Sequence, residues 1–280
     1  MKIITFGDIK STKLLWTLSE SLKYCDLENR HEIIFYSLGY DSDFVHEKVT
    51  TKRIDMGKIR FKDERDYQFM KPRVLILSIF DFPNEENFVY IDLDVLFGRR
   101  FDPEKLVKEH DLKNCKFPLC VKHTLNRFGF NYTQELVQNH YDIVNNDFVF
   151  KELIQNCFML YNRKHLEFLK EWNDLCYSDW YCDKLSISFW NHPSGDESIL
   201  WYLFMKYKFE KNLGYIYNNK CPDVWINHIE NNNNHWVSIE NIESSVEDTS
   251  QIQFYHYQKN FENNKKILDT ILSKNKTSNY

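Results

Sequence analysis

Two apolar runs flank an amphipathic segment within the first 36 residues, and this order constrains the fold more than any other feature. Residues 3–7 and 33–36 are short apolar runs typical of buried strands. Ser11 is predicted to cap a helix between them. That helix carries apolar side chains at spacings of one, three and four residues, at Leu14, Leu15, Leu18 and Leu22. A strand, a helix and a strand in this order predict a parallel sheet with right-handed crossovers, whose ligand site lies beyond the carboxyl ends of the strands.

The rest of the chain continues this alternation. Helices are predicted over residues 66–79, 164–175 and 198–207, and strands over residues 88–91, 157–161 and 253–256. Only seven Gly and six Pro in 280 residues leave little room for a flexible linker, and 42% hydrophobic residues suffice for one large core. We therefore predict a single α/β domain over residues 1–261, with a mostly parallel central sheet flanked by helices. Residues 262–280 are predicted to form a C-terminal surface helix and tail.

Charge and cysteine content exclude several classes of protein. The net charge is −5 and the basic residues are scattered among acidic ones, unlike those of a dedicated nucleic-acid binder. The seven cysteines form no C-x-x-C pair, so neither a zinc ribbon nor a complete disulfide framework is expected. No segment approaches the roughly 18 apolar residues of a membrane span, and the apolar start is too short for a signal peptide. We expect a cytoplasmic protein with reduced thiols and no integral membrane association.

Asp92 and Asp94 directly follow the predicted strand at residues 88–91. Two carboxylates two residues apart on a strand point the same way, and their repulsion calls for a neutralising partner. A Mg²⁺ or Mn²⁺ ion prefers such oxygen ligands and commonly bridges carboxylates to substrate phosphates. The alternative is that both are ordinary turn residues at a strand end. Their place after a central strand favours a metal site that neutralises a diphosphate leaving group.

The segment around these two aspartates resembles a known motif. Residues 88–97, FVYIDLDVLF, resemble the strand and D-x-D motif of GT-A glycosyltransferases, near the glycogenin-like and related families. Upstream, residues 67–72 are similar to the family segment in which a basic residue precedes an apolar helix. Downstream, residues 156–162 are similar to its N-x-G-x-x-x-x-N strand, with Cys157 in place of the usual small residue.

Two later motifs extend the resemblance, which spans residues 1–260. Residues 195–197, Gly-Asp-Glu, resemble the acidic motif that precedes a helix. Residues 254–257 resemble the C-terminal segment that donates a histidine to the metal, although the glycine and Lys-Pro-Trp that often follow it are missing. The resemblance implies a nucleotide-sugar-binding half over residues 1–97 and an acceptor half over residues 98–261.

The resemblance also implies roles for individual residues. It assigns the metal to Asp92, Asp94 and His256, and the imidazole favours Mn²⁺ over Mg²⁺. Asp196 or Glu197 is expected to bind the acceptor hydroxyl, and to act as general base if the reaction inverts the anomeric centre.

Donor binding is expected to involve several elements. Phe6 and Gly7, at the first strand end, are expected to hold the nucleotide through backbone groups. Lys71 is expected to contact a phosphate or the sugar as a point charge. The resemblance adds the D-x-D segment, including Leu93, and Asn156.

Each of these assignments has a structural alternative. Asp196 could cap a helix, His256 could be a hydrogen-bonded core group, and Lys71 could simply be solvated beside Pro72. Trp172 and the aromatic residues that follow it could stack on a sugar, but they are expected first of all in the core.

Together these features predict a metal-dependent glycosyltransferase of the hexosyltransferase type, with a nucleotide-diphosphate sugar, preferably UDP-linked, as donor. The acceptor stays open among a glycan, a protein, a lipid and a modified nucleic-acid base. Two alternatives remain, a metal-dependent nucleotidyltransferase and a non-catalytic nucleotide- or sugar-binding module. The sequence contains neither G-x-x-x-x-G-K-[ST] nor G-x-G-x-x-G, which excludes a P-loop or dinucleotide fingerprint.

Overall fold

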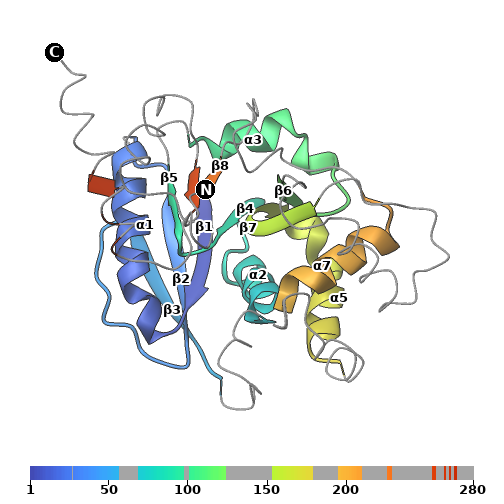
Figure 1. The fold of residues 1–280 in the computed structure, drawn as a ribbon, viewed down its shortest axis with the longest axis horizontal. Coiled ribbons are helices and arrows are strands. Elements are labelled where there is room, and N and C mark those ends of the chain that lie inside the picture. The colour runs from blue at the N-terminus through green and yellow to red at the C-terminus, as the bar shows by residue number, and fades with distance from the viewer. Residues whose placement is uncertain are drawn as a thin grey trace, which may run out of the picture.

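The computed structural model describes residues 1–26, 28–56, 69–97, 101–123, 153–178, 195–209, 226–228 and 254–256, and residues 262, 265, 268 and 269. Within this part of the chain, a central sheet lies between two helical layers (Figure 1). Helix α1 (Thr12–Cys25) packs on one face of the sheet. The other face is covered by α2 (Met70–Asp81), α5 (Leu166–Cys176) and α7 (Gly195–Lys206).

Six strands form the central sheet, in the order β3-β2-β1-β4-β7-β6. They are β1 (Lys2–Gly7), β2 (Glu32–Leu38), β3 (Val49–Ile54), β4 (Asn87–Ile91), β6 (Leu119–His123) and β7 (Leu153–Asn162). Strands β1 to β4 are parallel to one another, and β7 is antiparallel to both β4 and β6. The predicted mostly parallel sheet with flanking helices is confirmed.

A second, smaller sheet joins distant parts of the chain. It contains β5 (Val95–Phe97), β8 (Ile226–His228) and β9 (Phe254–His256), in the order β5-β9-β8. Strand β9 is antiparallel to β5 and parallel to β8. Residues 254–256 are thereby paired with residues 95–97, which follow β4 after a short turn. A further short helix, α3 (Pro103–Glu109), follows β5.

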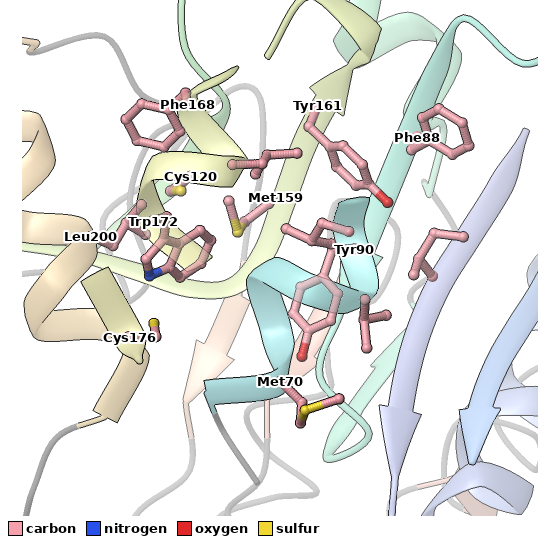
Figure 2. Packing of buried hydrophobic residues seen from close by; sticks show 14 of the residues in the cluster. Met70, Phe88, Tyr90, Cys120, Met159, Tyr161, Phe168, Trp172, Cys176 and Leu200 are labelled. Atoms are coloured by element: carbon pink, nitrogen blue, oxygen red, sulfur yellow. The ribbon is translucent and has the colours of Figure 1, made fainter. Parts of the chain in front are cut away.

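Alternate residues of the strands pack against opposite helical layers. In β1, Ile3 belongs to the hydrophobic cluster with α1, whereas Ile4 belongs to the cluster with α2, α5 and α7. Figure 2 shows this second cluster, in which Tyr90 of β4 and Tyr161 of β7 lie on neighbouring strands. Trp172 of α5 is fully buried in it, as expected of a core aromatic residue.

The helices differ from the prediction mainly at their beginnings. Helix α2 begins at Met70 among the described residues, and residues 66–68 lie outside them. Helix α7 begins at Gly195 rather than at residue 198, because acidic side chains are favourable in a first helical turn. Ser11 precedes α1 but makes no capping bond; its hydroxyl instead donates to Asp8 Oδ1 at 2.6 Å.

Side chains from β7 and the residue after it hold α2 in place. The Ser78 hydroxyl lies 2.7 Å from the Tyr161 hydroxyl, across the interface between α2 and β7. The Arg163 guanidinium donates to the carbonyl oxygens of Ile79 at 2.9 Å and Phe82 at 2.5 Å. These carbonyls belong to the C-terminal end of α2, where backbone oxygens lack helical partners and a cation is favourable.

Some expectations from composition can be compared with the described residues. None of their helices is both long and apolar enough to cross a membrane. The five cysteines among them are free thiols; Cys182 and Cys221 lie outside this part of the chain. Residues 262, 265, 268 and 269 are helical, and Leu268 is fully buried while the other three are exposed. Of these four residues, Leu268 therefore packs against the protein.

His165 joins the end of β7 to the segment before β6. Its Nδ1 accepts from the Asn162 amide at 3.2 Å, so its Nε2 carries the proton and donates to the Cys115 carbonyl at 3.2 Å. The ring is fully buried, and this burial lowers the pKa of His165 to about 4, from 6.5. The folded state therefore favours the neutral imidazole of His165.

We predict that His165 makes stability depend on pH between the unfolded pKa and the folded one. Its contribution is present in full above pH 6.5 and is lost as the pH falls toward about 4, because only the unfolded chain then takes up a proton. Between pH 7.5 and pH 5, the free energy of unfolding measured with urea should fall by about 2 kcal/mol more in the wild type than in His165→Gln. An equal loss in both proteins would show that His165 is not the responsible group.

Candidate active site

The carboxyl ends of β1 and β4 lie side by side at one edge of the central sheet. The two strands are parallel, with Ile4 opposite Tyr90, and β2 pairs with the other side of β1. Strand order therefore reverses at β1, and such a switch point is where open α/β sheets bind ligands. Phe6 and Gly7 end β1 here, and Asp92 follows the end of β4.

Asp92, Leu93 and Asp94 form a turn between β4 and β5. The Asp92 amide donates to the Cys157 carbonyl at 2.8 Å, and the Val95 amide donates to the Asp92 carbonyl at 3.3 Å. The premise that both aspartates lie on a strand is therefore wrong, and the turn rather than strand alternation sets their directions. Asp94 is 8% exposed, and Leu93 packs in the core on the α1 side.

Lys71 lies beside Asp92 in the first turn of α2. Its Nζ is 3.2 Å from Asp92 Oδ1 and 4.9 Å from the centre of the Tyr90 ring. Lys71 is only 5% exposed, so the solvated alternative is wrong. An ammonium group removed from water is costly unless it is paired, and here a carboxylate, an aromatic face and the Asn156 side chain surround it.

Strand β7 carries a bulge next to this site. On β6, Cys120 and Val121 are consecutive, whereas their partners on β7 are Met159 and Gln155. Residues 156–158 therefore lie opposite no residue of β6. A bulge of this kind often redirects a side chain near an active site.

The bulge decides the direction of Asn156. Strict alternation would place Asn156 on the same face as Phe158, which packs on the α1 side. Instead, Asn156 Oδ1 accepts from Lys71 Nζ at 2.8 Å, on the α2 side, and Cys157 packs on the α1 side. Asn156 therefore belongs to the site through the hydrogen bond that it accepts from Lys71.

The first strand end is packed closely against the D-x-D turn. A Cβ atom at Gly7 would lie 2.7 Å from Leu93 Cδ1 and 2.7 Å from Ser11 Cβ. No side chain fits there, so Gly7 offers only backbone groups to a ligand. Phe6 is 6% exposed and packs against Tyr90 with ring centres 6.1 Å apart. The structure thus brings Phe6 and Gly7 together with the acidic turn.

His256 reaches this region through the second sheet. Val95, the residue after Asp94, lies opposite His256 in the antiparallel pair of β5 and β9. The backbone of His256 is therefore beside the acidic turn, although its side chain lies outside the described part of the structure. Among the side chains that are described, no three His, Cys, Asp or Glu residues form a metal-binding group.

Asp196 and Glu197 lie in the first turn of α7. The structure describes their backbone and not their side chains, so their contacts lie outside the described part. Because α7 begins at Gly195, Asp196 lies inside its first turn. It does not occupy the N-cap position, before the helix, that the structural alternative gives it.

No protein-family model and no curated protein matches the sequence. Solved glycosyltransferase structures match its fold. The galactosyltransferase LgtC, in complex with donor and acceptor sugar analogues, has a TM-score of 0.56 at 9% identity, over 98% of this chain and 96% of its own. A glycosyltransferase involved in glycosylation of the major capsid of PBCV-1 has a TM-score of 0.52 at 13% identity, over 95% of this chain and 98% of its own. This chain has a glycosyltransferase fold.

The bifunctional glycosyltransferase WbbM also shares the fold, with a TM-score of 0.56 at 11% identity. The match covers 97% of this chain but 49% of WbbM, so the fold corresponds to about half of that larger protein. The glycosyltransferase fold agrees with the resemblance found in the sequence. Because one fold can host several activities, the reaction depends on the residues of the site and not on the fold.

Tyr90 is a site residue that the sequence analysis did not identify. Its hydroxyl donates to Asp92 Oδ1 at 2.5 Å, and its ring contacts Phe6 and Lys71. The signal was present, since Tyr90 stands two residues before Asp92 and a tyrosine hydroxyl needs a partner when it is buried.

We predict that Gly7→Ala destabilises the protein, because the added methyl group would force apart β1, α1 and the turn around Leu93. Overpacking of this kind costs about 1–3 kcal/mol. Urea unfolding should therefore show a lower free energy of unfolding. The double variant Gly7→Ala/Leu93→Ala lacks the close contact with the Leu93 side chain. Its loss of unfolding free energy should therefore be smaller than the sum of the losses in Gly7→Ala and Leu93→Ala. Strict additivity would contradict the proposed contact.

Proposed function

We propose that this protein is a metal-dependent glycosyltransferase that moves a sugar from a nucleotide-diphosphate sugar to an acceptor. The observation that carries the proposal is the buried Lys71 held beside Asp92, at the switch point of a glycosyltransferase fold. A UDP-linked hexose is the preferred donor. The source of this preference is the resemblance of the D-x-D segment to GT-A glycosyltransferases.

The position of Lys71 supports a role in ligand binding. A positive charge in the first turn of a helix opposes the helix dipole, and no acidic residue lies in the first turn of α2 to offset it. Contacts with Asp92, Asn156 and the Tyr90 ring compensate the burial of the ammonium group. These contacts hold the positive charge at the edge of the sheet where ligands bind, a place that suits an anionic ligand better than it suits helix stability. We propose that Lys71 contacts the diphosphate or the sugar of the donor.

The D-x-D turn has the chemistry of a site for a hard cation. Asp92 retains 29% side-chain exposure, and of its two carboxylate oxygens only Oδ1 takes part in the contacts with Lys71 and Tyr90. Asp94 follows in the same turn, and β9 brings the backbone of His256 beside it. Two carboxylates and an imidazole fit Mn²⁺, or Mg²⁺ with oxygen ligands alone. Such a cation would neutralise charge on the diphosphate leaving group.

The remaining assignments complete the donor and acceptor sides. Gly7 and Phe6 would present backbone groups to the nucleotide, and the main chain of Leu93 would contact the donor beside them. Asn156 would act through Lys71, whose Nζ it binds. On the acceptor side, Asp196 or Glu197 would bind the acceptor hydroxyl from the first turn of α7.

Two other functions are compatible with an acidic turn at this place. A nucleotidyltransferase also uses a cation with a diphosphate, and a binding module needs no chemistry at all. A panel of nucleotide sugars with Mn²⁺ separates these possibilities. Released nucleoside diphosphate supports the transferase, released sugar 1-phosphate indicates transfer of a nucleotidyl group, and binding without turnover on any acceptor indicates a binding module.

We predict that UDP binds with higher affinity in Mn²⁺ than in EDTA, because the cation would join the carboxylates of the turn to the phosphates. Asp94→Asn should weaken the Mn²⁺-dependent part by roughly tenfold or more. Asp174→Asn, at an exposed position of α5, is the matched control and should bind as the wild type does. Calorimetry with UDP and GDP provides the measurement. Equal UDP affinity in Mn²⁺ and in EDTA would remove the metal from the proposal.

We predict that His256→Ala lowers Mn²⁺ affinity, because β9 places His256 opposite the residue that follows Asp94. His228→Ala is the matched control, since His228 pairs with His256 in the register but lies one strand farther from the turn. Water-proton relaxation at pH 7.5 should show weaker Mn²⁺ binding only in His256→Ala. Wild-type affinity in that variant would return His256 to a structural role.

A further inference from the structure

Tyr90 connects most of the groups that the proposed donor site uses. It is only 2% exposed and lies on β4, two residues before Asp92. Its hydroxyl donates to Asp92 Oδ1 at 2.5 Å. Its ring lies 4.9 Å below the Lys71 ammonium and packs against Phe6 at 6.1 Å. One buried side chain therefore contacts the carboxylate, the cationic residue and the end of β1.

The two groups that hold Asp92 act on the same oxygen. Both the Tyr90 hydroxyl and the Lys71 ammonium contact Oδ1, and Oδ2 takes part in neither contact. Asp92 lies in a turn, so strand packing does not hold its side chain. A hydrogen bond from a rigid, buried ring can hold it instead. Because the hydroxyl is neutral, it orients the carboxylate without cancelling the negative charge that attracts a cation.

We propose that Tyr90 is a positioning residue for the metal site: its hydroxyl holds Oδ1 of Asp92, so that Oδ2 of the same carboxylate is available to the cation. This inference rests on the proposed function. Hydrogen bonds to metal-ligating carboxylates orient them, and their loss typically weakens metal binding about 10- to 100-fold. The ring of Tyr90 has a separate task, since its face supports the Lys71 ammonium.

The test uses two tyrosines that differ in what their hydroxyls touch. Tyr90→Phe removes the bond to Asp92 and retains the ring. Tyr161→Phe is the matched control, because Tyr161 is fully buried in the same cluster (Figure 2), on the neighbouring strand β7. Its hydroxyl lies 2.7 Å from Ser78 Oγ. Each variant loses one buried hydroxyl contact, so thermal unfolding should show similar losses of stability.

Mn²⁺ alone is titrated into each protein and followed by water-proton relaxation. We expect the Mn²⁺ affinity of Tyr90→Phe to fall about tenfold, and that of Tyr161→Phe to stay within about twofold of the wild type. UDP affinity is then measured at low and at saturating Mn²⁺. Saturating Mn²⁺ should restore the UDP affinity of Tyr90→Phe, because the defect lies in cation binding and not in the nucleotide contacts.

The outcomes distinguish this inference from the proposed function. Mn²⁺ binding by the wild type with equal affinity in Tyr90→Phe would overturn the positioning role and leave the proposed function standing. A defect shared equally by Tyr161→Phe, or one that saturating Mn²⁺ does not restore, would also overturn it, since a general loss of packing would then explain the result. A wild-type protein that binds no Mn²⁺, with or without UDP, would overturn both.

Discussion

The buried ammonium of Lys71 is the interaction on which the arrangement of the site depends. A charged group that is 5% exposed requires partners, and three side chains from β4, the turn after it and β7 supply them. Asp92 follows β4, Asn156 belongs to β7, and the Tyr90 ring lies on β4. Removal of any one partner would leave a buried charge partly uncompensated. The contact therefore joins α2, β4 and β7 at the carboxyl edge of the sheet.

The rest of the packing keeps this ammonium in place. Helix α2 is held in its last turn by the contact between Ser78 and Tyr161, and at its C-terminal end by Arg163. The bulge in β7 turns Asn156 toward α2. On the other side, the missing side chain of Gly7 lets Leu93 approach β1 closely. Core packing on both faces of the sheet thus positions the D-x-D turn, and a glycosyltransferase fold supplies the frame for the proposed donor site.

Local patterns were sufficient for most elements, because each depends on its own side chains. The strands near residues 3–7, 33–36 and 88–91 were predictable from short apolar runs, and α1 from its helical spacing. The short strands β5 and β8 were not predictable, because three residues carry too little pattern and gain their hydrogen bonds only from distant partners. The beginning of α7 was also missed, since a Gly-Asp-Glu segment is as typical of a helix cap as of a first turn.

The sequence by itself determined the α/β class, the order of the first strands and the place of the acidic pair after a buried strand, because periodicity and apolar runs are local properties. It could also name Lys71, Asn156 and His256 as candidates, through their resemblance to motifs. Only the tertiary structure decided that Lys71 is buried against Asp92, that a bulge redirects Asn156, and that β9 runs beside β5. The physical reason is that burial, strand register and pairing partners depend on residues far apart in the chain, and no local pattern encodes the distance between them.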